Sequence, residues 1–303
     1  MQAAPFTAIE TPRDSASLVL LRDHDTGLQV LLQRRNARAS NMAGVYVFPG
    51  GKLDPEDHWR DGALHLDQAC AHLVGALAEA DTPAALASAL YVAALREALE
   101  ECGLLLAEPR GLDSRISLEA ARSGVDVNAA RARLRAGEGF TELLAAMNLR
   151  LQTRALTPWS RWITPTTPSM STRRFDTRFF VARAPEAQVA LHDDEETVDT
   201  QWLAPRQALE QYRDGAIDLA PPQIMTLAHL ARFGNADQAL QAAASRRPPT
   251  ILPQAYDDGG VRLICYPGDE RHAVRDCAMP GPTRLLLRER RFVPEAGFDA
   301  LFE

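Results

Sequence analysis

The chain has 303 residues, 46% of them hydrophobic and 24% charged, which is typical of a water-soluble protein with a sizeable core and room for one large or two small domains. Its formal net charge of −7 argues against a general nucleic-acid binder, which needs a basic surface, but not against a protein that binds a small anion. The four cysteines are widely spaced and form no CxxC pair, which argues against a disulfide framework or a zinc finger and favours the reducing cytoplasm. The sequence also lacks a signal-peptide core and an apolar run of membrane length, which argues against a membrane partner.

Three short apolar runs near the start of the chain predict β-strands, at residues 17–21, 28–33 and 45–48. Residues 24–27 separate the first two runs, so a β-hairpin is expected there. Residues 67–107 then follow a helical pattern, in which Thr82-Pro83 predicts a helix start and Gly103 a helix end.

The rest of the chain predicts a further mixture of helices and strands. Helices are expected at 118–151, 205–212 and 222–233, and strands at 174–182, 200–203, 261–266 and 284–288. Helices that interleave with strands indicate an α/β or α+β layered domain. The tail from Pro248 fits either a β-hairpin over a sheet edge or a dimer contact, and the sequence does not choose between them.

Three glutamates share one face of the helix predicted around residues 91–103. At 100° per residue, Glu97, Glu100 and Glu101 lie within about 100° of one another, and the opposite side is apolar. On an isolated helix such a face is usually only solvated. Carboxylates three or four residues apart repel by roughly 0.2–0.5 kcal/mol per pair, however, and a hard cation such as Mg²⁺ would reverse this repulsion because it prefers oxygen ligands.

The loop Phe48-Pro-Gly-Gly-Lys52 precedes this helix in the sequence. Paired glycines let a backbone pass close to a ligand or a metal, where a Cβ would obstruct it. Alone, Gly50-Gly51 would more often be an ordinary turn. The combination of this loop, the acidic helix and Gly103 is more specific than any of the three.

These residues resemble the signature of the Nudix hydrolases, G-x5-E-x7-R-E-U-x-E-E-x-G-U, in which U is a bulky apolar residue. The second half stands here at residues 96–104 and matches every fixed position, with only the small Ala98 at a U site. In the first half, which starts at Gly51, Asp57 takes the place of the glutamate. Residues 58–95 number 38 where the pattern has 7, an insertion of 31 residues that costs little closure entropy in a loop.

The resemblance implies a Nudix-type α/β/α sandwich around a mixed sheet. We expect one domain at residues 1–245, with helical insertions at about 58–88 and 110–155, and a C-terminal β-hairpin extension at 246–303 packed on the same domain. The inserted residues 67–80 would pack against the main domain or a second subunit, or would form a lid or a pocket wall. A homodimer is therefore compatible with the sequence.

In the Nudix family the helix glutamates bind Mg²⁺ or Mn²⁺, which activates water for attack on a pyrophosphate. Carried over position by position, the metal ligands would be Glu97, Glu100, Glu101 and the backbone carbonyls near Gly50 and Gly51. The resemblance makes Arg96 the positioning partner of these carboxylates and Glu97 a candidate general base.

Further residues are candidates for the site, each with a structural alternative. Glu196, in the loop 192–196 before a late strand, could be an extra metal ligand or base, or part of a solvated turn. The candidates for substrate binding are Arg34, Arg35, Phe48, Arg173 and Arg174. Each arginine could hold a phosphate as a bidentate donor or form a structural salt bridge, and Phe48 could stack on a substrate or pack in the core.

The interrupted signature resembles the branch of the family that hydrolyses coenzyme A (CoA) and acyl-CoA esters. The chain keeps part of that branch's element before the glycine loop, but it has Gln33 where the branch has threonine and Ser40 at a basic position. The resemblance implies cleavage of a small nucleotide substrate, CoA or acyl-CoA, to 3′,5′-ADP and a phosphopantetheine. Hydrolysis of ADP-ribose, a dinucleotide or a nucleotide sugar is the alternative, and a nucleotide sensor without catalysis is the second one.

Overall fold

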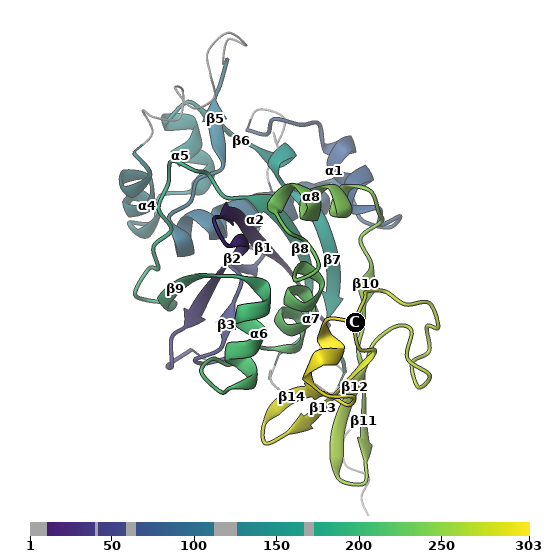
Figure 1. The fold of residues 1–303 in the computed structure, drawn as a ribbon. Coiled ribbons are helices and arrows are strands. Elements are labelled where there is room, and N and C mark those ends of the chain that lie inside the picture. The colour runs from purple at the N-terminus through teal and green to yellow at the C-terminus, as the bar shows by residue number, and fades with distance from the viewer. Residues whose placement is uncertain (1–10, 40–41, 59–64, 112–125, 167–172) are drawn as a thin grey trace, which may run out of the picture.

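The computed structural model describes residues 11–39, 42–58, 65–111, 126–166 and 173–303. Its centre is a mixed sheet in the order β10-β7-β8-β1-β2-β3, in which β4 also pairs with β1 and β9 with β2 (Figure 1). The strands are β1 (Arg13–His24), β2 (Gly27–Arg35), β3 (Tyr46–Val47), β4 (Gly50–Lys52), β7 (Thr157–Ile163), β8 (Phe175–Arg183), β9 (Thr197–Leu203) and β10 (Thr250–Ile251). The β1–β8 and β10–β7 pairs are parallel and the others antiparallel. The expected α/β fold with a mixed sheet is confirmed.

Both faces of this sheet are covered by helices. Successive side chains of a strand point to opposite faces, so a strand that is apolar throughout needs a covering layer on each side. On β1, Leu18 and Leu20 pack into one core cluster together with α2 (Ala84–Cys102). Val19 and Leu21 pack into a second cluster on the other face. The helices of that second face are α6 (Pro205–Arg213), α7 (Pro221–Leu230) and α8 (Ala236–Ala244).

Helix α2 carries the acidic segment and is apolar almost all round, so nearly all of it is buried. It starts one residue later than expected: Pro83 is the cap residue, and the Thr82 hydroxyl instead donates to Glu79 at 2.7 Å. The helix ends as expected at Gly103, which has a left-handed conformation with φ of 66°.

The expected insertions form small helical units beside α2. In the first, α1 (Cys70–Leu77) packs on α2 through the buried side chains of Leu73 and Leu77. The second contains β5 (Ala107–Pro109), α4 (Val127–Arg135), α5 (Phe140–Ala146) and β6 (Leu149–Leu151). Single 3-10 turns lie at Pro55–Asp57, Thr153–Ala155 and Phe298–Leu301. The inserted residues 67–80 therefore pack against the main domain.

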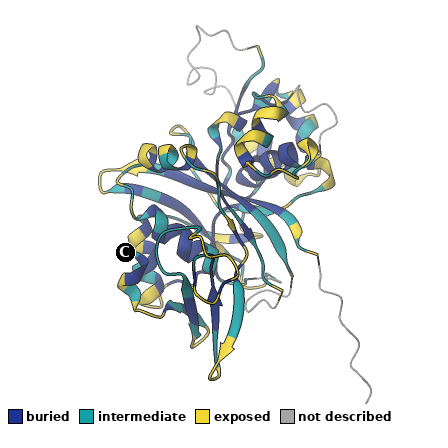
Figure 2. Ribbon diagram, turned by 90° about the vertical axis from the view of Figure 1, so that its right-hand side faces the viewer, coloured by how far each residue is buried: buried dark blue, intermediate teal, exposed yellow. Residues whose placement is uncertain are grey.

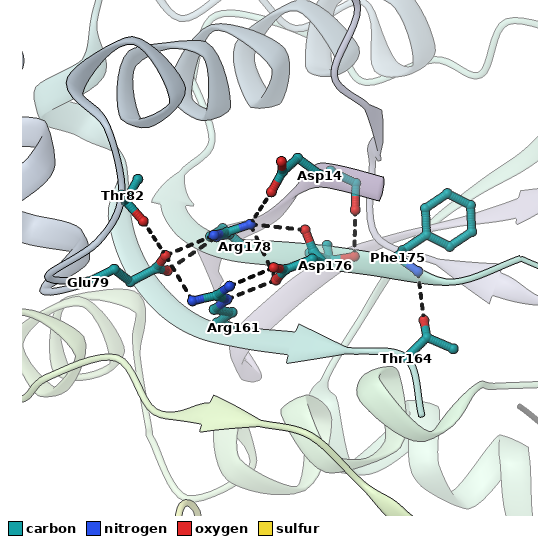
Figure 3. Close-up of polar contacts among 10 residues, drawn as sticks. Asp14, Glu79, Thr82, Arg161, Thr164, Phe175, Asp176 and Arg178 are labelled. Carbon is teal, nitrogen blue, oxygen red and sulfur yellow. Dashed lines mark hydrogen bonds and ion pairs between the residues drawn. The ribbon is translucent and has the colours of Figure 1, made fainter. Parts of the chain in front are cut away.

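An ion-pair network fixes the end of the first insertion to the central sheet (Figure 3). Glu79 accepts hydrogen bonds from Arg178 on β8 at 2.8 Å and from Arg161 on β7 at 3.1 Å. Arg161 also forms a fork with Asp176, and Arg178 reaches Asp14 at 2.6 Å. Because Arg178 is only 3% exposed, its buried positive charge needs these acids to compensate it.

The C-terminal part forms a second, antiparallel sheet, larger than the single hairpin expected. Its strands are β11 (Gln254–Asp258), β12 (Val261–Cys265), β13 (Arg284–Arg288) and β14 (Arg291–Pro294). Ile264, Leu285 and Phe292 share the core cluster of Trp159 and Trp162, while the tip of the β11–β12 hairpin is exposed (Figure 2).

The link to this sheet, β10, pairs with β7 and thereby covers the edge of the central sheet. Of the seven α-helices in the described residues, none has the length and apolarity needed to cross a bilayer.

Candidate active site

The acidic end of α2 lies directly against the diglycine strand β4. A Cβ on Gly51 would overlap the Glu97 Oε1 atom, so only glycine lets this carboxylate approach the backbone. At Gly50, with φ of 152°, a Cβ would overlap the backbone of β1. The Gly50 N–H donates to Glu101 Oε2 at 2.9 Å, which ties the helix to the strand.

Arg96 is the centre of the polar contacts on this side of the helix. Its guanidinium forms a fork with Asp57, from Nε to Oδ1 at 2.9 Å and from Nη2 to Oδ2 at 3.0 Å. Nη1 donates to Glu97 Oε1 at 3.1 Å and to Glu100 Oε2 at 2.8 Å. One arginine thus orients two glutamates, and it is paired with Asp57, which stands 39 residues earlier at the position of the first glutamate in the Nudix signature.

The acidic face is mostly buried, not solvated: Glu97 is 9% exposed and Glu101 is 2% exposed. Burial raises the pKa of Glu97 to about 7 although Arg96 opposes the rise, and the charges of Glu100 and Glu196 add to it. Burial, followed by the charge of Glu97, raises the pKa of Glu101 well above its ordinary value. Burial also raises the pKa of Glu100. This arrangement disfavours three negative charges unless a cation joins them.

The donor set at this place fits a hard divalent cation. It consists of carboxylate oxygens beside a backbone that approaches closely, and Glu101 Oε1 is buried without a hydrogen-bond partner among the described residues. In the described part of the chain, no three His, Cys, Asp or Glu side chains are gathered as a finished ligand shell. Glu97 and Glu100 instead accept hydrogen bonds from Arg96, which keeps their carboxylates from converging on one point.

Two residues that the sequence did not single out for the site hold the end of α2 in place. Gln33 on β2 is completely buried and donates to the carbonyl of Glu101 at 3.0 Å. Arg131 on α4 donates to the carbonyls of Glu100 and Glu101 at 2.9 and 2.8 Å, so a cation satisfies the helix C-terminus. The departure at Gln33 is therefore structural. Ser40 lies outside the described residues.

The remaining candidates divide between the site and other parts of the fold. Arg35 faces the site: its charge acts on Glu101, and its buried Nε has no hydrogen-bond partner among the described residues. Glu196 is exposed, and its charge raises the pKa of both Glu97 and Glu101. Arg34 is exposed on the opposite face of β2, beside Tyr46.

The remaining candidates are Phe48 and the two arginines before β8. Phe48 is 2% exposed and packs edge-on against Phe179 at 6.3 Å between ring centres. Of its two expected roles, packing in the core and stacking on a substrate, this position fits the first. The Arg174 Nε donates to the carbonyls of Thr164 and Pro165, a structural contact. Arg173 is exposed at the start of the same segment.

Comparison with known proteins gives concordant matches in sequence and fold. The sequence model of the family described as NUDT19 Nudix domain matches residues 2–230. The acyl-coenzyme A diphosphatase NUDT19 of Homo sapiens is 30% identical over 291 residues, which cover 80% of this chain and 72% of that protein. The protein of the same name from Xenopus laevis is 24% identical over 82% of this chain and 72% of its own length.

A solved structure, the Nudix hydrolase from Alicyclobacillus acidocaldarius, superposes with a TM-score of 0.58 at 27% identity. The superposition covers 77% of this chain and 97% of that one.

Proposed function

The chain belongs to the Nudix hydrolases, within the family of the NUDT19 Nudix domain, and we propose that it hydrolyses the pyrophosphate bond of CoA or acyl-CoA. The observation that carries this proposal is the intact set Arg96, Glu97, Glu100 and Glu101, held against Gly50-Gly51. Sensors that have lost catalysis would be expected to lose these glutamates, and all three are present.

The chain's own residues supply positioning and proton transfer. Arg96 and Asp57 fix the rotamers of Glu97 and Glu100 at the end of a rigid helix, which limits the reorganisation needed during the reaction. Glu97 and the exposed Glu196 are the candidates to accept the proton of the attacking water. Arg35, whose buried Nε has no partner in the described part of the chain and whose charge acts on Glu101, is the candidate to bind a substrate phosphate oxygen.

We assign the carboxylates of Glu97, Glu100 and Glu101, with the carbonyls of Gly50 and Gly51, as the residues that would hold Mg²⁺ or Mn²⁺. Such an ion would neutralise charge on the pyrophosphate and lower the pKa of a water. In the overall reaction, water adds to one phosphorus, the bridging P–O bond breaks, and CoA yields 3′,5′-ADP and 4′-phosphopantetheine.

The choice of CoA over other nucleotide substrates rests on two points. Two relatives that match most of this chain are named acyl-coenzyme A diphosphatase. In addition, Gln33, which differs from the CoA-branch element, is a completely buried support of α2. The difference at this position therefore does not count against CoA.

A product assay tests the proposal. The purified chain is incubated with CoA, an acyl-CoA, ADP-ribose, a dinucleotide and a nucleotide sugar, each with Mg²⁺ and with Mn²⁺, and products are identified by mass spectrometry. We expect 3′,5′-ADP and (acyl-)phosphopantetheine, formed only with metal and lost in Glu100→Gln and Glu101→Gln variants that remain folded. A preference for ADP-ribose would overturn the CoA assignment, and no turnover of any substrate would overturn the assignment as an enzyme.

A further inference from the structure

A cavity of about 220 Å³ lies between the first insertion and the segment after α8, away from the acidic end of α2. It is bounded by α1, by the first half of α2 and by the start of β7. Its described lining residues are Gln68, His72, Ala76, Tyr91, Arg154, Leu156, Thr157, Pro158, Ala243, Ala244, Arg246 and Pro248. Tyr91 precedes Glu97 by six residues of α2, a separation of about 9 Å along the helix, so the cavity is distinct from the glutamate site.

The described lining of this cavity contains two arginines and a histidine but no aspartate or glutamate, although the whole chain carries a net charge of −7. Arg154 is held by Asp67, which lies outside the lining, through its Nε at 2.5 Å and through a bond from Nη2 to the Asp67 carbonyl. This contact fixes the guanidinium beside the cavity. The local charge is thus opposite in sign to that of the chain.

Arg246 is the more informative of the two arginines. Its Nε and Nη2 atoms are buried, and neither has a hydrogen-bond partner among the described residues. The guanidinium lies over the Trp159 ring at 4.7 Å, and burial lowers its pKa without an opposing acid. Buried, unpaired donors on a cation are costly, so this group needs an acceptor that the described chain does not provide.

Two spaces adjoin Arg246. One, of about 10 Å³ beside Thr226 and His229, has room for a single water. The other is the cavity of about 220 Å³, which has room for a molecular anion and is also lined by Arg154, Thr157 and Tyr91.

We propose that this cavity binds a phosphate group, carried by free phosphate or by a small phosphomonoester, with Arg246 as its principal ligand. A phosphate offers several acceptor oxygens and a double negative charge, which suits the Arg246 donors that lack a partner among the described residues and the neighbouring charge of Arg154. The site does not depend on the hydrolytic reaction or on a metal, and its failure would leave the proposed function untouched.

Isothermal titration with inorganic phosphate and with glycerol 3-phosphate, in EDTA and without nucleotide, tests this site directly. We expect one binding event for at least one of the two probes. In Arg246→Met its affinity should fall at least about tenfold, the loss expected for a charged hydrogen bond. Arg247→Met, a change at the exposed neighbour, and Glu101→Gln, a change at the other site, should leave the affinity unchanged.

A second pair of variants keeps the test valid if Arg246→Met is poorly folded. Ala76→Glu adds an acid to the exposed cavity wall on α1 and should weaken binding by repulsion, whereas Ala71→Glu, exposed on the same helix but outside the lining, should not. Thermal unfolding curves verify that each variant is folded. The proposal would be overturned if neither probe binds at about 10 mM. It would also be overturned if a probe binds but neither Arg246→Met nor Ala76→Glu weakens its binding.

Discussion

The buried charges around Arg96 show what single residues contribute to this site. The Arg96 guanidinium donates at least one hydrogen bond to each of Asp57, Glu97 and Glu100. Removing one partner of a buried pair leaves the other charge uncompensated, which typically destabilises a protein by about 3–5 kcal/mol. Substitution of Arg96 therefore confounds folding with catalysis, and exposed site residues give cleaner tests.

Glu196 is such an exposed residue. If it accepts a proton or helps to hold the metal, Glu196→Gln should lower kcat by about 10²-fold or more and leave the free energy of unfolding within about 0.5 kcal/mol of wild type. Steady-state kinetics and urea unfolding measure the two quantities. Glu195→Gln, at the exposed neighbouring position, is the matched control and should be neutral. Equal activity in both variants would remove Glu196 from the site.

At the scale of elements, the position of α2 over β4 depends on a backbone without side chains. In Gly51→Ala the new methyl group would overlap Glu97 Oε1, so this carboxylate must move away from the strand. We expect kcat/KM to fall by at least about 100-fold, because positioning errors near 1 Å have this effect. Gly75→Ala in α1, where a Cβ has open space, should not reduce activity, and loss of activity in both would point to a general sensitivity to such changes.

The connection between the first insertion and the sheet depends on Glu79. Burial alone would raise its pKa, but hydrogen bonds from Arg178 and Thr82 prevail and hold the pKa below its ordinary value of 4.5. The carboxylate therefore stabilises the fold at pH values above 4.5, and this contribution is lost as the pH falls through the lowered pKa.

Glu79→Gln should accordingly lower the free energy of unfolding at pH 7 by about 2 kcal/mol, and the difference from wild type should shrink as the pH falls below 4.5. Urea unfolding at several pH values measures it. Asp81→Asn, at an exposed position two residues later, should have little effect at any pH. A Glu79→Gln difference that does not vary with pH would show that the ion pairs are not its source.

At the scale of the whole molecule, the C-terminal sheet shares the core of the catalytic domain. Phe292 on β14 is 2% exposed and belongs to the same cluster as Trp159 and Trp162 of β7. We propose on this basis that residues 1–245 and 246–303 unfold as one unit.

Phe292→Ala should then lower the free energy of unfolding, followed by tryptophan fluorescence, by about 3–5 kcal/mol. Trp159, Trp162 and Trp202 lie in β7 and β9 of the central sheet, so their fluorescence would report a shift far along the chain from the substitution. An unchanged tryptophan transition would mean that the C-terminal sheet unfolds separately, and it would contradict this interpretation.

The features predictable from the sequence are those that local periodicity or a short motif determines. The period of α2 placed Glu97, Glu100 and Glu101 on one face, and the glycine pair was expected near them, although in a loop and not in the strand β4 that the structure shows. The strands β1, β2, β8 and β9 were expected near their observed positions.

Other features depend on long-range contacts that no local pattern records. Arg131 reaches the end of α2 from 30 residues away, and Gln33 reaches it from 68 residues away. Helix α8 was not expected, although Ala236, Ala239 and Ala243 are buried at helical spacing, because alanine is a weak apolar signal. The burial of Glu97 and Glu101 was also missed, since the helical period shows only that they share a face, and not what covers it.

Divalent-metal binding by the acidic helix is the claim on which the proposed reaction depends. Titration with Mn²⁺, followed by the electron paramagnetic resonance signal of the free ion, measures this binding directly in wild type and in the folded double variant Glu100→Gln/Glu101→Gln. We expect the double variant to bind Mn²⁺ at least about tenfold more weakly than wild type and than Glu195→Gln. Equal affinity and stoichiometry in all three proteins would contradict the account.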